Sequence, residues 1–128
     1  MKHYYYTDEF LEHLAEPHNV GVLENPDGYA VERAPSAICG DTVRMMISVN
    51  GESIADIKYK VYGCAVVIAG CSMLSFMVKG KPIVEVEAIS VDFLAEKLGG
   101  IPSKKEECLG VAIGALKSAI KKYRDGLP

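Results

Sequence analysis

Two alternating segments on either side of Asn50-Gly51 constrain the fold of this chain more than any other feature. From Thr42 to Val49 bulky apolar residues recur at every second position, and in the segment from Ile54 to Tyr62 the residues Ile57, Tyr59 and Val61 repeat this spacing. Such alternation predicts strands, and Asn-Gly between two of them is the strongest short-range signal for a hairpin. Because the outer ends of an antiparallel pair lie side by side, residues 39–41 and Cys64 are expected to converge.

A helix buried on all sides is predicted directly after the second of these strands. Residues 65–78 are small or apolar at nearly every position, and Gly63 lies at the joint, where a chain leaving a strand often needs glycine. Cys64 is therefore expected at the first turn of this helix, among backbone N–H groups that lack intrahelical partners. This position favours a thiolate, the form of cysteine that binds metals or attacks sulfur.

The other expected elements are short, except for the last helix. A first helix is capped by Thr7 and ended by Pro17, and an edge strand is expected over 29–33. Helical segments are expected over 84–88 and 91–98, and the apolar stripe of the last helix runs from Leu109 to Tyr123. Cys108 lies at or just before the start of that last helix, so its setting repeats that of Cys64.

The composition is that of an ordinary globular protein and narrows the range of partners. The chain of 128 residues suits one domain over 1–128, with 49% hydrophobic and 24% charged residues. A net charge of −3 gives no basic surface for nucleic acid, and no apolar run approaches the roughly 20 residues of a membrane span. The start of the chain lacks the apolar core of a signal peptide, so a cytoplasmic location is expected. There, four cysteines indicate metal binding or catalysis rather than disulfides.

Three of the cysteines, Cys39, Cys64 and Cys108, lie in predicted loops or at helix starts. None belongs to a Cys-x-x-Cys pair, so neither a zinc finger nor a thioredoxin-type site is indicated. Asp41 adds a carboxylate, which binds iron or zinc less tightly than a thiolate does. Such a set can hold an iron–sulfur cluster or zinc and release it again. The alternative is that the cysteines pack as small hydrophobic residues and that Asp41 only begins a strand.

The fourth cysteine and the histidines are interpreted differently. Cys71 lies about 10 Å from Cys64 by helix rise and has core-like neighbours, so it is predicted to pack in the core. His3, His13 and His18 all lie in the N-terminal region and are interpreted as surface or turn residues rather than ligands.

An ordered set of short motifs extends over nearly the whole chain, from about Tyr6 to Tyr123. The motifs are Pro17-His18-Asn19-Val20-Gly21, Cys39-Gly40-Asp41, Tyr62-Gly63-Cys64, Val78-Lys79-Gly80-Lys81 and a third cysteine that opens the C-terminal helix. This set resembles the IscU/NifU-type iron–sulfur cluster assembly scaffolds, the family of the NifU N-terminal domain. The resemblance implies an α+β fold, in which a small, mostly antiparallel three-stranded sheet is covered by helices to form an α/β sandwich.

The resemblance also implies the roles of particular residues. Cys39, Asp41, Cys64 and Cys108 would bind a transient [2Fe–2S] cluster, or Zn²⁺ or Fe²⁺ when no cluster is present. A cysteine desulfurase would deliver persulfide sulfur, with Cys108 as the usual acceptor, and the cluster would pass to iron–sulfur acceptor proteins. A homo-oligomer is a further expectation for the cluster-bound form. A protein of this kind is a carrier and not an enzyme.

Two positions depart from the family pattern. Glu107 precedes the third cysteine, where members often carry histidine, and its carboxylate is a harder, negatively charged alternative as a fourth ligand. Residues 101–105 read Ile-Pro-Ser-Lys-Lys, whereas members that depend on Hsp70/J-protein chaperones carry Leu-Pro-Pro-Val-Lys. The chaperones are therefore an expected partner whose recognition loop is altered in this chain.

Two other functions stay open at this stage. A related branch consists of zinc-dependent sulfurtransferases, in which Cys108 would accept persulfide and pass it on. That branch carries an insertion before the last helix, for which the run from Lys81 to Cys108 leaves no room. The third hypothesis is a degenerate scaffold-like protein that binds partners, or binds zinc structurally, and it is motivated by Glu107 and the altered loop.

Overall fold

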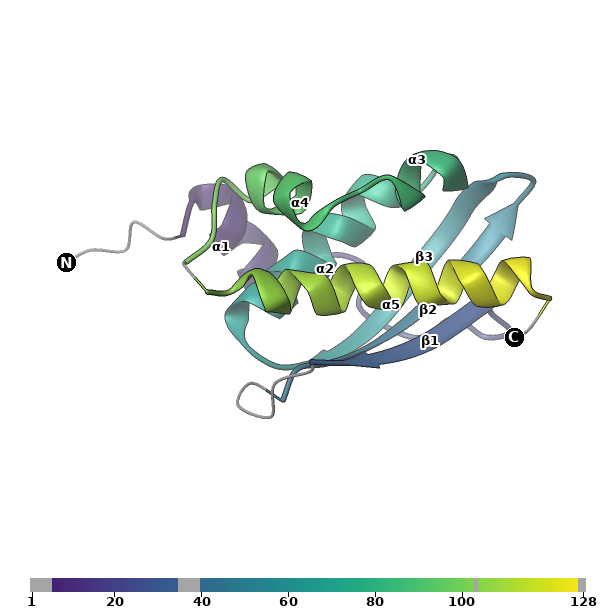
Figure 1. The fold of residues 1–128 in the computed structure, drawn as a ribbon, viewed down its shortest axis with the longest axis horizontal. Helices are drawn as coiled ribbons and strands as arrows, with labels where there is room; N and C mark the ends of the chain where they lie inside the picture. The colour runs from purple at the N-terminus through teal and green to yellow at the C-terminus, as the bar shows by residue number, and fades with distance from the viewer. Residues whose placement is uncertain (1–5, 35–39, 103, 127–128) are drawn as a thin grey trace.

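The computed structural model describes residues 6–34, 40–102 and 104–126. Within these residues three antiparallel strands form one sheet in the order β1 (Gly28–Arg33), β2 (Thr42–Asn50), β3 (Ser53–Tyr62). The helices of the same residues are α1 (Asp8–Ala15), α2 (Ala65–Val78), α3 (Ile83–Glu87), α4 (Val91–Lys97) and α5 (Glu106–Arg124). Figure 1 shows the helices gathered over one face of the sheet, which confirms the predicted α+β class.

The hairpin around Asn50-Gly51 forms as predicted. β2 and β3 pair antiparallel from Thr42 opposite Tyr62 to Asn50 opposite Ser53. Gly51 has a φ of 65°, a left-handed conformation that glycine adopts without the steric cost that a side chain brings. β1 pairs antiparallel with β2, so the expected edge strand over 29–33 is also confirmed, with Gly28 as an additional first residue.

The core lies between the sheet and two helices, α2 and α5. The inward side chains of the strands are fully buried; they include Val43, Met45, Ile47, Ile57 and Tyr59. α2 packs against β3 on one side and against α1, α4 and α5 on others, which explains why its residues are apolar on nearly every side. α5 lies so close to β1 that a Cβ on Gly28 would overlap the carbonyl group of Ala119.

The shorter helices lie within one or two residues of their predicted bounds. Thr7 caps α1, because its Oγ1 accepts a hydrogen bond of 3.1 Å from the N–H of Phe10. Ser90 caps α4 in the same way through the N–H of Phe93, also at 3.1 Å. α5 begins at Glu106, so Cys108 lies in its first turn, as the sequence predicts.

The prediction for His13 is wrong. His13 lies in α1 and is buried, with 8% of its surface exposed, rather than in a turn or on the surface. Its Nδ1 lies 2.6 Å from Oγ of Ser72 in α2, and this contact ties the two helices together. His18, by contrast, is exposed and follows α1 in a loop.

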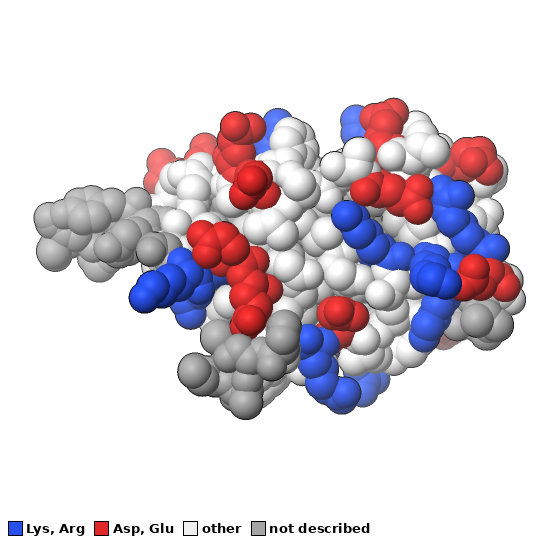
Figure 2. Space-filling model, viewed as in Figure 1, with Lys and Arg blue, Asp and Glu red and all other residues white. Residues whose placement is uncertain are grey.

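The charges on α5 follow the direction of its dipole. Acidic residues occupy the first turn and basic residues the last turn, where each sign is favoured by the partial charge of the helix end. Figure 2 shows the basic side chains gathered over the C-terminal end of this helix. In the part of the chain that the structure describes, no helix is long and apolar enough to cross a membrane.

Candidate metal centre

Three side chains that can bind a metal meet at one end of the molecule. Asp41 directly precedes β2, Cys64 is the N-cap of α2, and Cys108 lies in the first turn of α5. Each offers one ligand atom, and these atoms all lie within 4.8 Å of one another. The predicted convergence of Asp41 and Cys64 is thus observed, and Cys108 joins them because α5 packs beside α2.

Asp41 is held in place by the start of α2. Its side chain is buried, and its Oδ1 accepts a hydrogen bond of 3.1 Å from the backbone N–H of Cys64. This bond satisfies one of the N–H groups that a helix leaves without partners at its N-terminus. The other oxygen, Oδ2, lies 3.9 Å from Sγ of Cys64 and faces the thiols.

Gly63 permits the close approach of Asp41 to the helix. A Cβ at this position would overlap the carboxylate of Asp41, and it would also lie 2.7 Å from Cγ1 of Val67. Any side chain at residue 63 would therefore displace the carboxylate or the first turn of α2. The sequence indicates glycine at the joint for its backbone freedom, and the φ of 157° at Gly63 confirms this; the space beside Asp41 is a second requirement for glycine.

The two thiols are in contact with each other. Sγ of Cys64 lies 3.4 Å from Sγ of Cys108, and both are free cysteines. Burial raises the pKa of the Cys108 thiol, and the neighbouring Asp41 carboxyl and Cys64 raise this pKa further. A cation among the three groups would act in the opposite direction, because a metal stabilises the thiolate that binds it. The donor set therefore fits iron or zinc.

The remaining predicted site residues have different positions. Cys39 lies outside the described residues. Glu107 is exposed in the first turn of α5 and is not part of the group that Asp41, Cys64 and Cys108 form among the described residues. Cys71 is fully buried in the core, as predicted. Burial raises the pKa of its thiol, and the negative charge of Asp41 raises this pKa further.

A second polar cluster, which the sequence interpretation missed, anchors the loop after α1. Oγ of Ser72 contacts His13 and also accepts a hydrogen bond of 2.9 Å from the N–H of His18. Oγ of Ser75 accepts a bond of 3.0 Å from Nδ2 of Asn19. Two serines in an otherwise apolar buried helix are the signal for such a cluster, because a buried hydroxyl needs a partner.

Comparison with known proteins matches this chain to NifU-like N-terminal domains. A family model described as "NifU-like N terminal domain" matches residues 5–126. Of the solved structures, a nitrogen-fixing NifU-like protein (N-terminal) from Brucella abortus superimposes with a TM-score of 0.75 and 20% identity, covering 93% of this chain and 94% of that one. At that identity the superposition supports the fold alone.

Related sequences define the family more closely. IscU 1 of Archaeoglobus fulgidus, named an iron–sulfur cluster assembly scaffold protein, is 42% identical over 92% of this chain and 76% of its own length. The IscU scaffold protein of Aquifex aeolicus is 40% identical over 92% of this chain and 75% of its own length. That of Escherichia coli K12 is 37% identical over 93% of this chain and 94% of its own length. The chain therefore belongs to the NifU-like N-terminal domain family, that of the IscU-type iron–sulfur cluster assembly scaffolds, as the motifs indicate.

Proposed function

We propose that this chain assembles a transient [2Fe–2S] cluster from iron and desulfurase-derived sulfur and passes it to acceptor proteins. The observation that carries the proposal is the group formed by Asp41, Cys64 and Cys108, with ligand atoms within 4.8 Å of one another. Thiolates are the ligands that hold iron–sulfur clusters, and a carboxylate is a weaker ligand for the same metals. The names of the relatives, which are scaffold proteins for cluster assembly, support the same function.

The proposed ligand set is Cys39, Asp41, Cys64 and Cys108. Cys39 is included because it stands two residues before Asp41 in the sequence, in the motif Cys39-Gly40-Asp41. Glu107 is the alternative fourth ligand, since it shares the first turn of α5 with Cys108. In the absence of a cluster the same residues would hold Zn²⁺ or Fe²⁺.

Asp41 is proposed as the labile ligand that allows the cluster to leave. Its Oδ1 accepts a hydrogen bond from Cys64 N–H, and its Oδ2, which faces the thiols, is the oxygen proposed to contact a metal. A single carboxylate oxygen is a poor ligand for iron beside thiolates. Cys108 is the proposed acceptor of persulfide sulfur, next to Cys64 at 3.4 Å between sulfur atoms.

The function requires proteins of the iron–sulfur machinery as partners. A cysteine desulfurase would supply the sulfur, and apo-proteins that carry iron–sulfur clusters would receive the product. Hsp70/J-protein chaperones are further proposed partners, although Pro102 stands in an altered loop, and the cluster-bound form is proposed to associate into a homo-oligomer.

Anaerobic reconstitution tests the proposal. The protein would be incubated with a cysteine desulfurase, cysteine, ferrous iron and a dithiol reductant, which supplies the electrons that convert persulfide sulfur to sulfide. The product would then be analysed by visible absorption and by iron and acid-labile sulfide assays. Charge-transfer bands with equal amounts of iron and sulfide are expected, together with cluster transfer to an apo-ferredoxin. Cys64→Ser is expected to abolish the bands, whereas Cys71→Ala, the control outside the site, is expected to retain them. Normal assembly by Cys64→Ser would refute the proposed site.

A zinc-dependent sulfurtransferase is the second candidate, because two thiols and a carboxylate also suit zinc. This function predicts a colourless protein that holds zinc tightly and stimulates a desulfurase without forming a chromophore. The run from Lys81 to Cys108 is occupied by α3, α4 and short connections, which favours the scaffold over this branch. The same reconstitution separates the two functions.

A further inference from the structure

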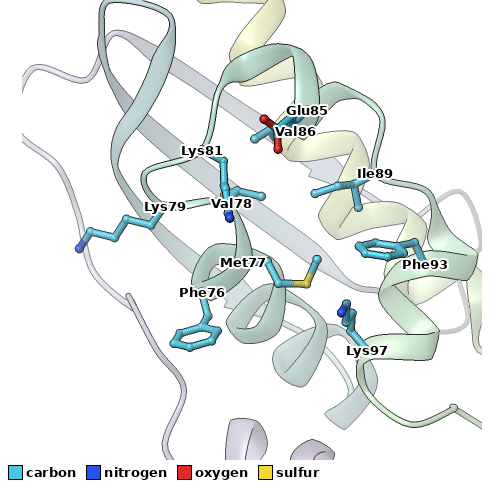
Figure 3. A pocket seen from close by; sticks show the side chains of 10 residues that line it. All are labelled: Phe76, Met77, Val78, Lys79, Lys81, Glu85, Val86, Ile89, Phe93 and Lys97. Carbon is cyan, nitrogen blue, oxygen red and sulfur yellow. The ribbon is translucent and has the colours of Figure 1, made fainter.

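A groove of about 590 Å³ lies between the C-terminal end of α2 and the pair α3 and α4. Figure 3 shows Met77 of α2, Ile89 of the connection between α3 and α4, and Phe93 of α4 directed toward its centre. Phe76 begins the groove 12 residues after Cys64, which is about 18 Å along the helix. The groove is therefore separate from the candidate metal centre, and a molecule bound in it would leave Cys64 accessible.

Two of the aromatic side chains that line the groove are exposed. The chain has three phenylalanines, of which Phe10 is fully buried. The other two, Phe76 and Phe93, are 59% and 40% exposed, and both line this groove. Exposed aromatic side chains gathered in one hollow are typical of a surface that a partner covers.

The charges around the groove identify the kind of partner. Lys81 and Lys97 line it, and neither forms an ion pair within the described residues. Nζ of Lys97 lies 5.2 Å from the centre of the Phe93 ring, so this charge sits directly above apolar surface. Lys79 is set apart, because it pairs with Asp56 at 3.2 Å and points away from the groove in Figure 3. Glu85 is the one acidic lining residue among those described.

We propose that this groove binds an acidic amphipathic helix of a partner protein. The apolar side of such a helix would cover Phe76, Met77 and Phe93, and its carboxylates would pair with Lys81 and Lys97. The positive charge of these two lysines contrasts with the net charge of −3 of the whole chain. An acidic partner is therefore favoured at this groove and not over the rest of the surface. The groove is an open hollow lined from three elements, a shape that suits the face of a helix.

Fluorescence anisotropy with a designed peptide tests this proposal on the metal-free protein, so the result does not depend on cluster assembly. The probe is a fluorescein-labelled helical peptide of about 14 residues with Leu and Phe on one side and Glu on the other. Saturable binding is expected, weakening as salt is raised. The double variant Lys81→Glu/Lys97→Glu is expected to weaken binding at least about tenfold, and Glu85→Gln to strengthen it. The control Lys117→Glu, on the exposed side of α5, is expected to bind normally.

Other outcomes would overturn the proposal. Equal binding of a peptide with Gln in place of Glu would show that charge does not select the occupant. Unchanged binding to the double variant, or NMR shift changes centred on the sheet instead of α2 and α4, would place the peptide elsewhere. A second copy of this chain is the other candidate occupant, because α1 is itself acidic and exposes Leu11. Self-association detected by sedimentation and lost in the Phe76→Ser variant would identify that second copy as the occupant.

Discussion

Asp41 combines two tasks that a substitution can separate. Its Oδ1 accepts a hydrogen bond from Cys64 N–H at 3.1 Å, and its Oδ2 faces the thiols. The first contact stabilises the fold, because it pairs a partly buried N–H at the start of α2 that has no partner within the helix. The second contact belongs to the proposed cluster chemistry, in which a weak ligand favours release.

Asp41→Asn and Asp41→Ala are therefore expected to differ in stability. Asn retains an oxygen for Cys64 N–H, whereas Ala removes it, so the alanine variant should be less stable by about 1 kcal/mol in urea unfolding of the metal-free protein. Both variants lose the carboxylate charge, so the comparison isolates the hydrogen bond. Equal stability would mean that the bond contributes nothing.

Gly63→Ala is expected to damage the candidate metal centre and the fold together. The new Cβ would overlap the Asp41 carboxylate and lie 2.7 Å from Cγ1 of Val67, so the turn or the carboxylate must shift. We expect a loss of about 2 kcal/mol or more in unfolding free energy and weaker zinc binding in a competition assay. Gly100→Ala is the matched control, because Gly100 also has a positive φ, of 105°, and nothing lies within 4 Å of its added Cβ. A Gly63→Ala protein as stable as this control would contradict the steric argument.

At the scale of elements, the contact between α1 and α2 gives stability a pH dependence. Burial lowers the pKa of His13, the nearby His18 lowers it further, and Glu12 partly offsets these effects. The folded protein thus favours neutral His13, whose contribution is present above the ordinary histidine pKa of about 6.5 and is lost as pH falls below it. We expect the urea midpoint to decrease between about pH 7 and pH 5, and to decrease less in His13→Gln. An equal decrease in that variant would assign the effect to other groups.

The elements are predictable from the sequence because their signals are local. The alternation on both sides of Asn50-Gly51 and the apolar run after Cys64 depend only on neighbouring residues, and both predictions are confirmed. The burial of His13 is not predictable in this way, because it depends on Ser72, 59 residues along the chain. The placement of Cys108 beside Cys64 is similar: the sequence puts each at a helix start, but only the packing of α5 on α2 brings the sulfur atoms together.

At the scale of the whole molecule, α2 separates two surfaces with different chemistry. Its N-terminal end carries Cys64 and the buried carboxylate of Asp41, whereas its C-terminal end carries exposed Phe76 beside the groove. The helix is buried along most of its length, so the two ends are held at a fixed separation. A partner bound in the proposed groove would therefore not touch the candidate metal centre.

The packing of α5 on α2 can also be tested by cross-linking, since Cys64 and Cys108 belong to different helices whose thiols lie 3.4 Å apart. Diamide, a mild thiol oxidant, should take two electrons and two protons from them and leave a disulfide in the metal-free protein. In the chain-entropy model a loop from residue 64 to residue 108 stabilises the fold by about 4 kcal/mol, so the urea midpoint should rise.

A Cys39→Ser background limits the reaction to the described cysteines, and peptide mapping identifies the bond. Cys71 is fully buried and should remain a thiol. Zinc added before diamide should block the cross-link, because both sulfur atoms would then be ligands. Cross-linking that zinc does not slow would show that the metal binds elsewhere, whereas protection by zinc would place both thiols, and with them the ends of α2 and α5, at one metal site.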